Sequence, residues 1–312
     1  MKKFRNILLM LLIAVFAFTS CGVEGQNNEK AKENKPEESA TTTEGSYKVG
    51  VSLSTLNNPF FISIREGVDE IAKNESVETI VTDAQNDSST QSNQVEDLIT
   101  QGVDLIIVNP VDSTAIAPSI QKANEANIPV ICVDRGSDEG ELLSFIASNN
   151  IEGGKMAGEY ILEQVGENAE VIQLEGIPGA SSTRERGQGF EEATSGKINL
   201  VASQTANFDR AEGLTVMENL LQAHPDVKAV FCQNDEMALG AREAIKASGK
   251  DIVVVGFDGN DDAVEAVKNG ELSATVAQQP KEMGKIAMET ALKHLKGETV
   301  EAQIDSPLEL IK

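Results

Sequence analysis

From Tyr47 onward the sequence alternates short runs of β-branched apolar residues with longer amphipathic stretches, and this alternation constrains the fold more than any other feature. It is typical of a parallel sheet with helices on both faces, because a parallel strand can follow another only after a long crossover. We predict strands at about 48–53, 78–83, 104–109, 129–133, 170–174, 199–204, 228–233, 252–257 and 273–277. We predict helices at about 59–74, 89–101, 114–126, 151–165, 181–195, 209–223, 235–247, 261–269 and 281–296. The alternation begins afresh after Ser148-Asn149, so we expect an α/β fold of two similar, doubly wound parallel-sheet lobes.

A weak internal repeat places polar side chains at the ends of four strands. A strand that ends at Asn109 is followed by one that ends at Asp134, and a strand that ends at Asn234 is followed by one that ends at Asp258. The carboxyl ends of parallel strands are where small ligands bind, so these groups would point into one cleft if the lobes face each other. For any one of them alone, a turn residue or helix cap is the simpler interpretation. Arg135, which follows Asp134, favours a binding site, because a turn does not need the several N–H donors of a guanidinium group.

The stretch from Val49 to Phe61 joins a buried strand to a helix. Asn58 is suited to cap that helix and Pro59 to begin it. Phe60 and Phe61 therefore follow the carboxyl end of a strand, where they can cover the apolar C–H faces of a sugar or a similar molecule. The alternative is that both rings belong to the core.

The first 45 residues indicate export and not folding. Basic residues precede an apolar run at 7–18 that is short for a membrane span, and Phe18-Thr19-Ser20-Cys21 follows it. We predict a lipoprotein signal peptide at 1–20 with Cys21 as the lipidated residue, the alternative being an uncleaved anchor. The segment 21–45 has almost no apolar side chains and is predicted to be a flexible tether.

Composition narrows the classes of partner. The formal net charge is −24, and the sequence contains no basic cluster. This balance argues against nucleic acid and against an anionic lipid surface as the partner. A transcriptional regulator would need an N-terminal helix-turn-helix and a basic face, where this chain has a signal and a tether. Cys132 and Cys232 lie in apolar runs and are expected to be buried free thiols, not a disulfide or a metal pair.

No catalytic function is predicted. Asp134 and Asp258 could be imagined as a glycosidase pair, but the neighbouring arginines are expected to hold both ionised, so neither is an obvious proton donor. Each Gly-Lys pair lacks the following Ser or Thr of a phosphate-binding loop. The two histidines, His224 and His294, lie in separate segments and form neither a metal cluster nor a triad.

Eight motifs occur in order along the chain: Ser54-Thr55-Leu56-Asn57-Asn58-Pro59-Phe60-Phe61, Ile107-Val108-Asn109-Pro110, Asn127-Ile128-Pro129-Val130 through Asp134-Arg135, Arg184-Glu185-Arg186-Gly187, Phe208-Asp209-Arg210, Ala223-His224-Pro225-Asp226-Val227, Gln233-Asn234-Asp235-Glu236-Met237-Ala238-Leu239-Gly240 and Val255-Gly256-Phe257-Asp258-Gly259. With these motifs the chain, from about residue 46 to its end, resembles the periplasmic sugar-binding proteins of ABC importers. The resemblance implies the type I fold of these proteins, in which two lobes close like a hinged shell. The N-terminal lobe would be 46–148, completed by about 280–306, and the C-terminal lobe 149–279, completed by about 307–312. The hinge is expected near Ser148-Asn149, Gln278-Gln279 and Ser306-Pro307-Leu308.

The resemblance further implies that a pyranose sugar, D-ribose, binds between the lobes. Its faces would be covered by three rings, those of Phe60, Phe61 and Phe208. Its hydroxyls would bind to planar polar groups that can each engage two neighbours, namely Asn58, Asn109, Asp134, Arg135, Arg186, Asn234, Asp258 and Gln278.

The same resemblance implies delivery of the sugar to an ABC permease and its ATPase by an extracytoplasmic protein anchored to the cell membrane through lipid on Cys21. We expect a monomer with no cofactor and no metal. Allose, xylose, galactose or autoinducer-2 is open as the alternative ligand, and a chemoreceptor is open as a further partner.

Overall fold

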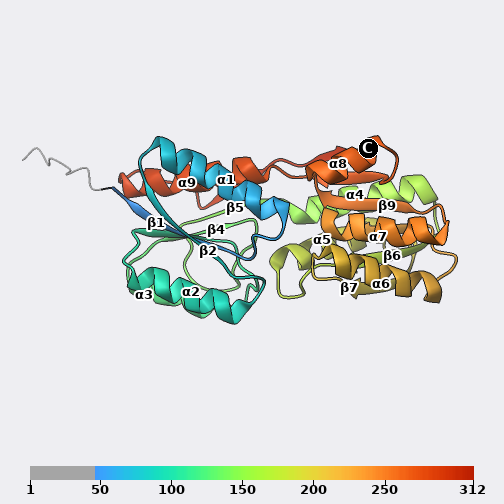
Figure 1. The fold of residues 1–312 in the computed structure, drawn as a ribbon, viewed down its shortest axis with the longest axis horizontal. Coiled ribbons are helices and arrows are strands. Elements are labelled where there is room, and N and C mark those ends of the chain that lie inside the picture. Colours follow the sequence, from blue (N-terminus) through green and yellow to red (C-terminus); the bar gives the residue numbers. More distant parts are fainter. Residues whose placement is uncertain (1–45) are drawn as a thin grey trace, which may run out of the picture. The chain divides into compact units, whose positions relative to one another are not determined.

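The computed structural model describes residues 46–312, which form two six-stranded sheets with helices on both faces (Figure 1). The predicted signal peptide, lipidation site and tether lie outside these residues. The first sheet is parallel throughout and has the order β11-β5-β4-β3-β1-β2. Its strands are β1 (Lys48–Leu53), β2 (Glu78–Asp83), β3 (Leu105–Val108), β4 (Val130–Val133), β5 (Ser144–Ser148) and β11 (Gln303–Ser306).

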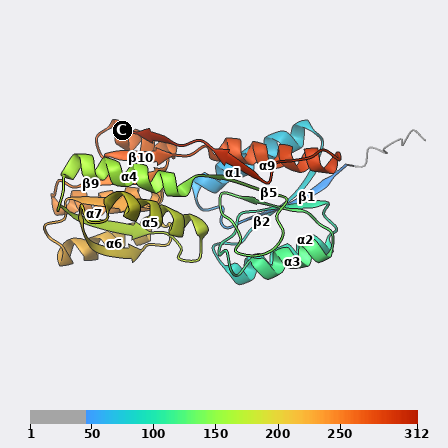
Figure 2. The same ribbon diagram turned by 180° about the vertical axis from the view of Figure 1, so that it is seen from behind.

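Four helices cover the first sheet. They are α1 (Pro59–Asn74), α2 (Ser88–Thr100), α3 (Ala117–Glu125) and α9 (Pro280–Leu295). Figures 1 and 2 show α1 and α9 on one face and α2 and α3 on the other. Each face has its own apolar cluster, with Val51 and Met288 in one and Leu98 and Ile120 in the other. The helix α9 returns from the second half of the chain to complete this lobe.

The second sheet has the order β12-β10-β9-β8-β6-β7, and only β12 runs antiparallel to its neighbour. Its strands are β6 (Glu170–Glu175), β7 (Asn199–Thr205), β8 (Ala229–Cys232), β9 (Val253–Asp258), β10 (Ala274–Ala277) and β12 (Glu309–Ile311). Its helices are α4 (Asn150–Val165), α5 (Ser181–Thr194), α6 (Arg210–Ala223), α7 (Asp235–Ser248) and α8 (Asp261–Lys268).

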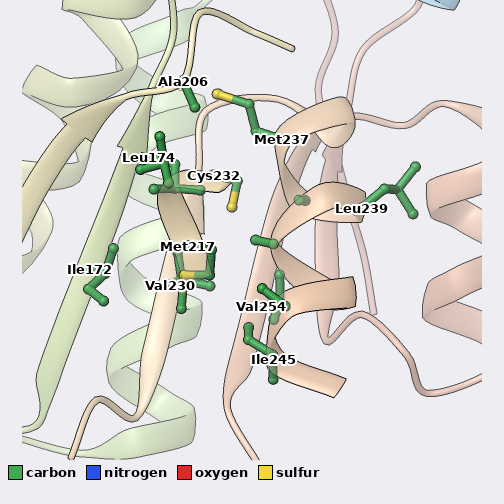
Figure 3. Close-up of a cluster of buried hydrophobic side chains, with 14 of the residues drawn as sticks. Ile172, Leu174, Ala206, Met217, Val230, Cys232, Met237, Leu239, Ile245 and Val254 are labelled. Carbon is green, nitrogen blue, oxygen red and sulfur yellow. The ribbon is translucent and has the colours of Figure 1, made fainter. Parts of the chain in front are cut away.

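Large apolar clusters lie on both faces of the second sheet. One joins α4 and α5 to the sheet and contains Phe190 stacked on Phe231, with ring centroids 5.0 Å apart. The other joins the sheet to α6, α7 and α8; Figure 3 shows Leu174 and Val254 of the strands gathered with Met217 and Ile245 of the helices. Burial of this apolar surface is the main force that holds each lobe together.

Three chain segments connect the two sheets. The chain crosses from β5 to α4, returns from β10 to α9, and crosses again from β11 to β12. This topology confirms the predicted α/β fold with two similar lobes and three connecting segments. The crossings fall at 148–150, 278–280 and 306–309.

Three strands were not predicted. The sequence pattern predicted no strand between residues 134 and 148 and none after residue 277. The structure has β5 in the first segment and β11 and β12 in the second. These strands are short, and β11 is largely exposed, so none carries the apolar pattern that reveals a buried strand. None of the helices in the described part has the length and apolar content that a membrane crossing needs.

Candidate functional site

A small cavity lies where the strand ends of one lobe meet those of the other. It is lined by Asn58, Phe60, Phe61, Asp134, Arg135, Ser182, Arg186, Phe208, Asn234 and Asp258. Nine of these ten residues are among the eleven that the resemblance implies as ligand contacts. The cavity volume is about 10 Å³, close to the space that one water molecule needs. A larger ligand can therefore enter only if the lobes move apart or the lining side chains rearrange.

Aromatic rings from both lobes line this cavity. Phe60 and Phe61 are in the first turn of α1, with centroids 5.3 Å apart and ring planes nearly perpendicular. Both also belong to the core cluster of the first lobe. The rings therefore contribute to the core and line the cavity at the same time. Phe208 follows β7 in the second lobe. The guanidinium carbon of Arg135 lies 5.0 Å from the ring centroids of both Phe61 and Phe208, within the range of a cation–π contact.

Each lobe contributes one aspartate–arginine pair. In the first, Arg135 Nε lies 3.6 Å from Asp134 Oδ2, and in the second, Arg186 Nη1 lies 3.7 Å from Asp258 Oδ1. Arg186 also donates from Nε to Asn150 Oδ1 at 2.9 Å and stacks on Phe257, with its guanidinium carbon 3.8 Å from the ring centroid. All four charged groups are buried. Buried charges need partners, and each pair supplies them within its own lobe.

The buried carboxyl groups are less acidic than the sequence suggested. Burial raises the pKa of Asp134, and Arg135 and Arg186 offset only part of that rise. Burial raises the pKa of Asp258 well above its usual value, against the attraction of Arg186. Burial also lowers the pKa of Arg135 to about 10. For both carboxyl groups desolvation outweighs the attraction of the arginines, so their pKa values shift upward and not downward.

Two asparagines cap helices and line the cavity at the same time. Asn58 Oδ1 accepts a hydrogen bond from Phe60 N at 2.9 Å, and Asn234 Oδ1 accepts one from Met237 N at 2.9 Å. The amide nitrogen of Asn234 also donates to Phe208 O at 3.3 Å. The cap interpretation and the site interpretation therefore do not exclude each other, since a cap uses only the oxygen of the amide.

Asn109 and Gln278 lie behind the cavity lining. Asn109 Nδ2 donates to Asp134 Oδ2 at 3.1 Å and to Val133 O at 3.0 Å, and Gln278 Nε2 donates to Asp258 Oδ1 at 3.0 Å. Each amide therefore holds the carboxylate of its own lobe in position.

Several polar atoms at the site have no partner among the described residues. They are Asp134 Oδ1, Arg135 Nε and Gln278 Oε1, all buried. A buried polar group without a hydrogen bond costs about 1–3 kcal/mol. A polar ligand that meets Asp134 Oδ1 or Arg135 Nε, which belong to residues that line the cavity, gains that much back.

Three residues that line the cavity have strained backbone conformations. Asp134, Phe208 and Asp258 have φ values of 65°, 60° and 127°, which are uncommon for residues other than glycine. Such strain is concentrated at functional sites. The ring of Phe208 lies against Gly176, where a Cβ atom would be 2.0 Å from its Cζ.

The lobes also touch each other beside the cavity. Three polar contacts join them, from Ser113 N to Gly179 O at 2.9 Å, from Gly136 N to Ser181 Oγ at 3.0 Å and from Arg184 Nη2 to Asp138 Oδ1 at 3.0 Å. They connect the loops after β3 and β4 with the start of α5. These contacts exist only while the lobes are close together.

Other chemistry has little support in the described residues. Between residues 46 and 312 no group of three or more His, Cys, Asp and Glu side chains is arranged to hold a metal. Cys132 and Cys232 are buried free thiols, as predicted, and burial raises the pKa of Cys132 to about 12. What the cavity offers is paired donors and acceptors beside aromatic faces, which suits a small molecule with several hydroxyl groups.

Ser182 is the one cavity residue that the sequence analysis missed. It lies four residues before Arg186 on α5, and residues with that spacing share a helix face. The spacing could therefore have indicated that Ser182 lies on the same helix face as Arg186. However, Ser181 and Thr183 on either side also carry hydroxyl groups, so the sequence alone did not distinguish Ser182 from them.

Comparison with known proteins agrees with this geometry. The family model described as "Periplasmic binding protein domain" matches residues 49–299. The chain is 49% identical over 310 residues to the "Ribose import binding protein RbsB" of Bacillus subtilis (strain 168), with 99% of each chain covered. It is also 49% identical over 265 residues to the protein of the same name from Escherichia coli (strain K12), with 84% of this chain and 90% of the relative covered.

Solved structures agree as well. An ABC transporter solute binding protein from Bacillus halodurans C-125 with bound myo-inositol has a TM-score of 0.83 at 36% identity, covering 87% of this chain and 96% of its own. A periplasmic solute binding protein from Actinobacillus succinogenes 130z with bound D-allose has a TM-score of 0.80 at 32% identity, covering 86% of this chain and 98% of its own. With its two lobes, its cavity between them and these relatives, the chain belongs to the periplasmic binding proteins.

Proposed function

We propose that this protein is the extracytoplasmic binding component of an ABC sugar importer, that it binds D-ribose between its lobes and that it delivers the sugar to the permease and its ATPase. One observation carries the proposal: an aspartate–arginine pair and aromatic rings from each lobe converge on one cavity. Relatives named as ribose import binding proteins support ribose as the sugar. Enzymatic turnover is not part of the proposed role.

The proposed contacts follow from the chemistry of the ligand. Each hydroxyl of a sugar both donates and accepts, so a carboxylate, an amide or a guanidinium can engage two neighbouring hydroxyls at once. The aromatic rings would cover the apolar C–H faces. The eleven residues proposed for these contacts are Asn58, Phe60, Phe61, Asn109, Asp134, Arg135, Arg186, Phe208, Asn234, Asp258 and Gln278, of which Asn109 and Gln278 would act through the carboxylates they hold.

Closure would couple binding to transport. A ligand that contacts both lobes favours the closed state by its higher affinity for that state, and the closed surface is what a permease can recognise. We propose that the lobes, 46–148 with about 280–306 and 149–279 with about 307–312, rotate about the three crossing segments. Small-angle scattering should show a decrease in the radius of gyration when ribose is added. An unchanged radius in the presence of saturating ribose would argue against this motion.

Calorimetric titration tests the substrate. The protein from Ser46 onward is titrated with ribose, allose, xylose, galactose, arabinose and autoinducer-2. Saturable one-to-one binding of ribose alone would support the proposal, and a signal from another member would transfer the role to that ligand. The control is Arg186→Ala, which should bind none of them while it still unfolds cooperatively.

We further propose a signal peptide at 1–20, a lipid anchor on Cys21, a flexible tether at 21–45 and a monomeric state. Mass spectrometry of the membrane fraction should find lipid on Cys21, and Cys21→Ala should release the protein into the medium or the periplasm. Unmodified Cys21 in membrane-bound protein would refute the anchor. A chemoreceptor would be a second partner for the same closed state, tested by chemotaxis toward ribose in a strain that lacks this protein.

A further inference from the structure

The start of helix α5 presents three consecutive hydroxyl side chains, and the structure gives them different environments. Ser181 Oγ accepts a hydrogen bond from Gly136 N of the other lobe at 3.0 Å. Thr183 is buried outside the cavity lining; its hydroxyl has no hydrogen-bond partner among the described residues, and its carbonyl accepts from Gln233 Nε2 at 3.1 Å. Ser182 lies between them and lines the cavity, as does Arg186 one turn later. Helical geometry therefore selects one of the three hydroxyls for the site.

The side chain of Ser182 is buried but not committed to another residue. Its exposure is 1% and no side-chain hydrogen bond of Ser182 is found within residues 46–312, but its hydroxyl is not among the fully buried atoms without a partner. The hydroxyl can donate one hydrogen bond and accept two. Because Ser182 lines the cavity, a ligand there can accept a hydrogen bond from this hydroxyl or donate one to it.

Ser182 and the first aspartate–arginine pair line the same cavity, and a contact between the lobes lies next to both in the sequence. Ser181 bonds to Gly136, and these two residues are the direct chain neighbours of Ser182 and Arg135. Asp134 Oδ1 and Arg135 Nε are buried there without partners. Ser182 of one lobe and Asp134 of the other therefore line the same cavity, where Asp134 Oδ1 has no hydrogen-bond partner among the described residues.

The chemistry of these groups defines what they can recognise together. An ionised carboxylate only accepts, so a ligand hydroxyl at Asp134 must donate to it. The lone pairs of that ligand oxygen then remain free for a donor. Ser182 lines the cavity from the opposite lobe and its hydroxyl can donate, so such a contact would form only when the lobes are close together.

We propose that Ser182 is a specificity-determining residue whose hydroxyl donates a hydrogen bond to the sugar hydroxyl that is bound by Asp134. The inference rests on the proposed function, because it takes the ligand to be a sugar. It adds that one particular hydroxyl is recognised from both lobes, and that sugars that lack it or have it in the opposite configuration are rejected in part through Ser182.

The test is a double-mutant cycle between protein and ligand. The purified parent protein and Ser182→Ala are titrated with D-ribose and with the monodeoxy analogues of ribose, each of which lacks one hydroxyl. Loss of one neutral hydrogen bond should weaken ribose binding by roughly threefold to tenfold. For one analogue, and for that one only, the substitution should cause no further loss, because the partner hydroxyl is already absent.

A matched control separates this role from a structural one. Thr183→Val changes a neighbouring buried hydroxyl that does not line the cavity, and it should bind every sugar as the parent does. Equal losses in Ser182→Ala for ribose and for all the deoxy analogues would overturn the proposal, and so would unchanged ribose affinity. If the parent binds no sugar in the series, the proposed function itself fails; if the parent binds ribose and the cycle shows no coupling, only the inference about Ser182 fails.

Discussion

A single methyl group at Gly176 should push Phe208 out of the binding cavity. The Cβ atom of an alanine there would lie 2.0 Å from Phe208 Cζ and 2.3 Å from its two Cε atoms. Carbon atoms pack best at about 3.5–4.0 Å, so the ring tip must move by roughly 1.5–2 Å. The backbone cannot easily absorb this shift, because Phe208 has a φ of 60° and its carbonyl oxygen accepts a hydrogen bond from Asn234.

The expected loss follows from the apolar area that the ring would cover. One ring face corresponds to roughly 50 Å², and at about 25 cal/mol per Å² its loss costs about 1.3 kcal/mol, or close to tenfold in the dissociation constant. Calorimetric titration with ribose measures this loss in Gly176→Ala, Phe208→Ala and the double variant. The double variant should bind no more weakly than Phe208→Ala, because both substitutions remove the same contact.

Gly136→Ala is the matched control for this experiment. It also adds a methyl group near the cavity, but there the nearest side-chain atom, Phe145 Cζ, is 3.6 Å away, an ordinary contact. Gly136→Ala should therefore bind ribose like the parent. Parent-like affinity in Gly176→Ala, or additive losses in the double variant, would refute the reasoning.

Three further predictions concern charged groups. Asp258→Asn should weaken ribose binding about tenfold to a hundredfold in calorimetry, because a charge-assisted hydrogen bond contributes about 1.5–3 kcal/mol; a loss below threefold would contradict this role. Asp138→Asn removes the half-exposed ion pair with Arg184 that joins the lobes, and it should weaken binding by at most about fivefold, with a smaller effect at high salt; an effect that does not depend on salt would argue against an electrostatic contact. Burial raises the pKa of Asp235 to about 7, so the folded state holds a proton that the unfolded state has lost. That proton makes the free energy of unfolding fall as the pH rises from about 4 to about 7, and urea titrations should show a smaller fall in Asp235→Asn; equal slopes for parent and variant would exclude Asp235 as the source.

The helices and most strands could be predicted from the sequence because they depend on residues that are close together in the chain. Val49, Val51 and Leu53 form a strand with buried side chains, and Asn58 caps the following helix as its position before Pro59 predicts. The residues that follow strands gather at the sheet edges as a consequence of topology alone, since all parallel strands point the same way. For this reason the internal repeat predicted that Asn109 and Asp134 lie close together, and a hydrogen bond joins their side chains.

The parts that were missed depend on contacts between distant segments. β5 and β11 pair Phe145 with Gln303 across more than half of the chain, and neither segment alone has a pattern that predicts this. Ser182 resembles its neighbours in sequence, and only the direction of its side chain on α5 distinguishes it. That Asn109 lies behind Asp134, where it orients the carboxylate, also required the structure.

By itself, then, the sequence determined the succession of strands and helices, the two-lobe fold and the set of polar and aromatic residues at the strand ends, because apolar periodicity and turn chemistry act over a few residues. Only the tertiary structure decided which of these side chains face the cavity, which support them from behind, and how burial shifts their pKa values. Those properties depend on contacts between segments that are distant in the sequence, since it is burial in the folded chain that raises the pKa of Asp258.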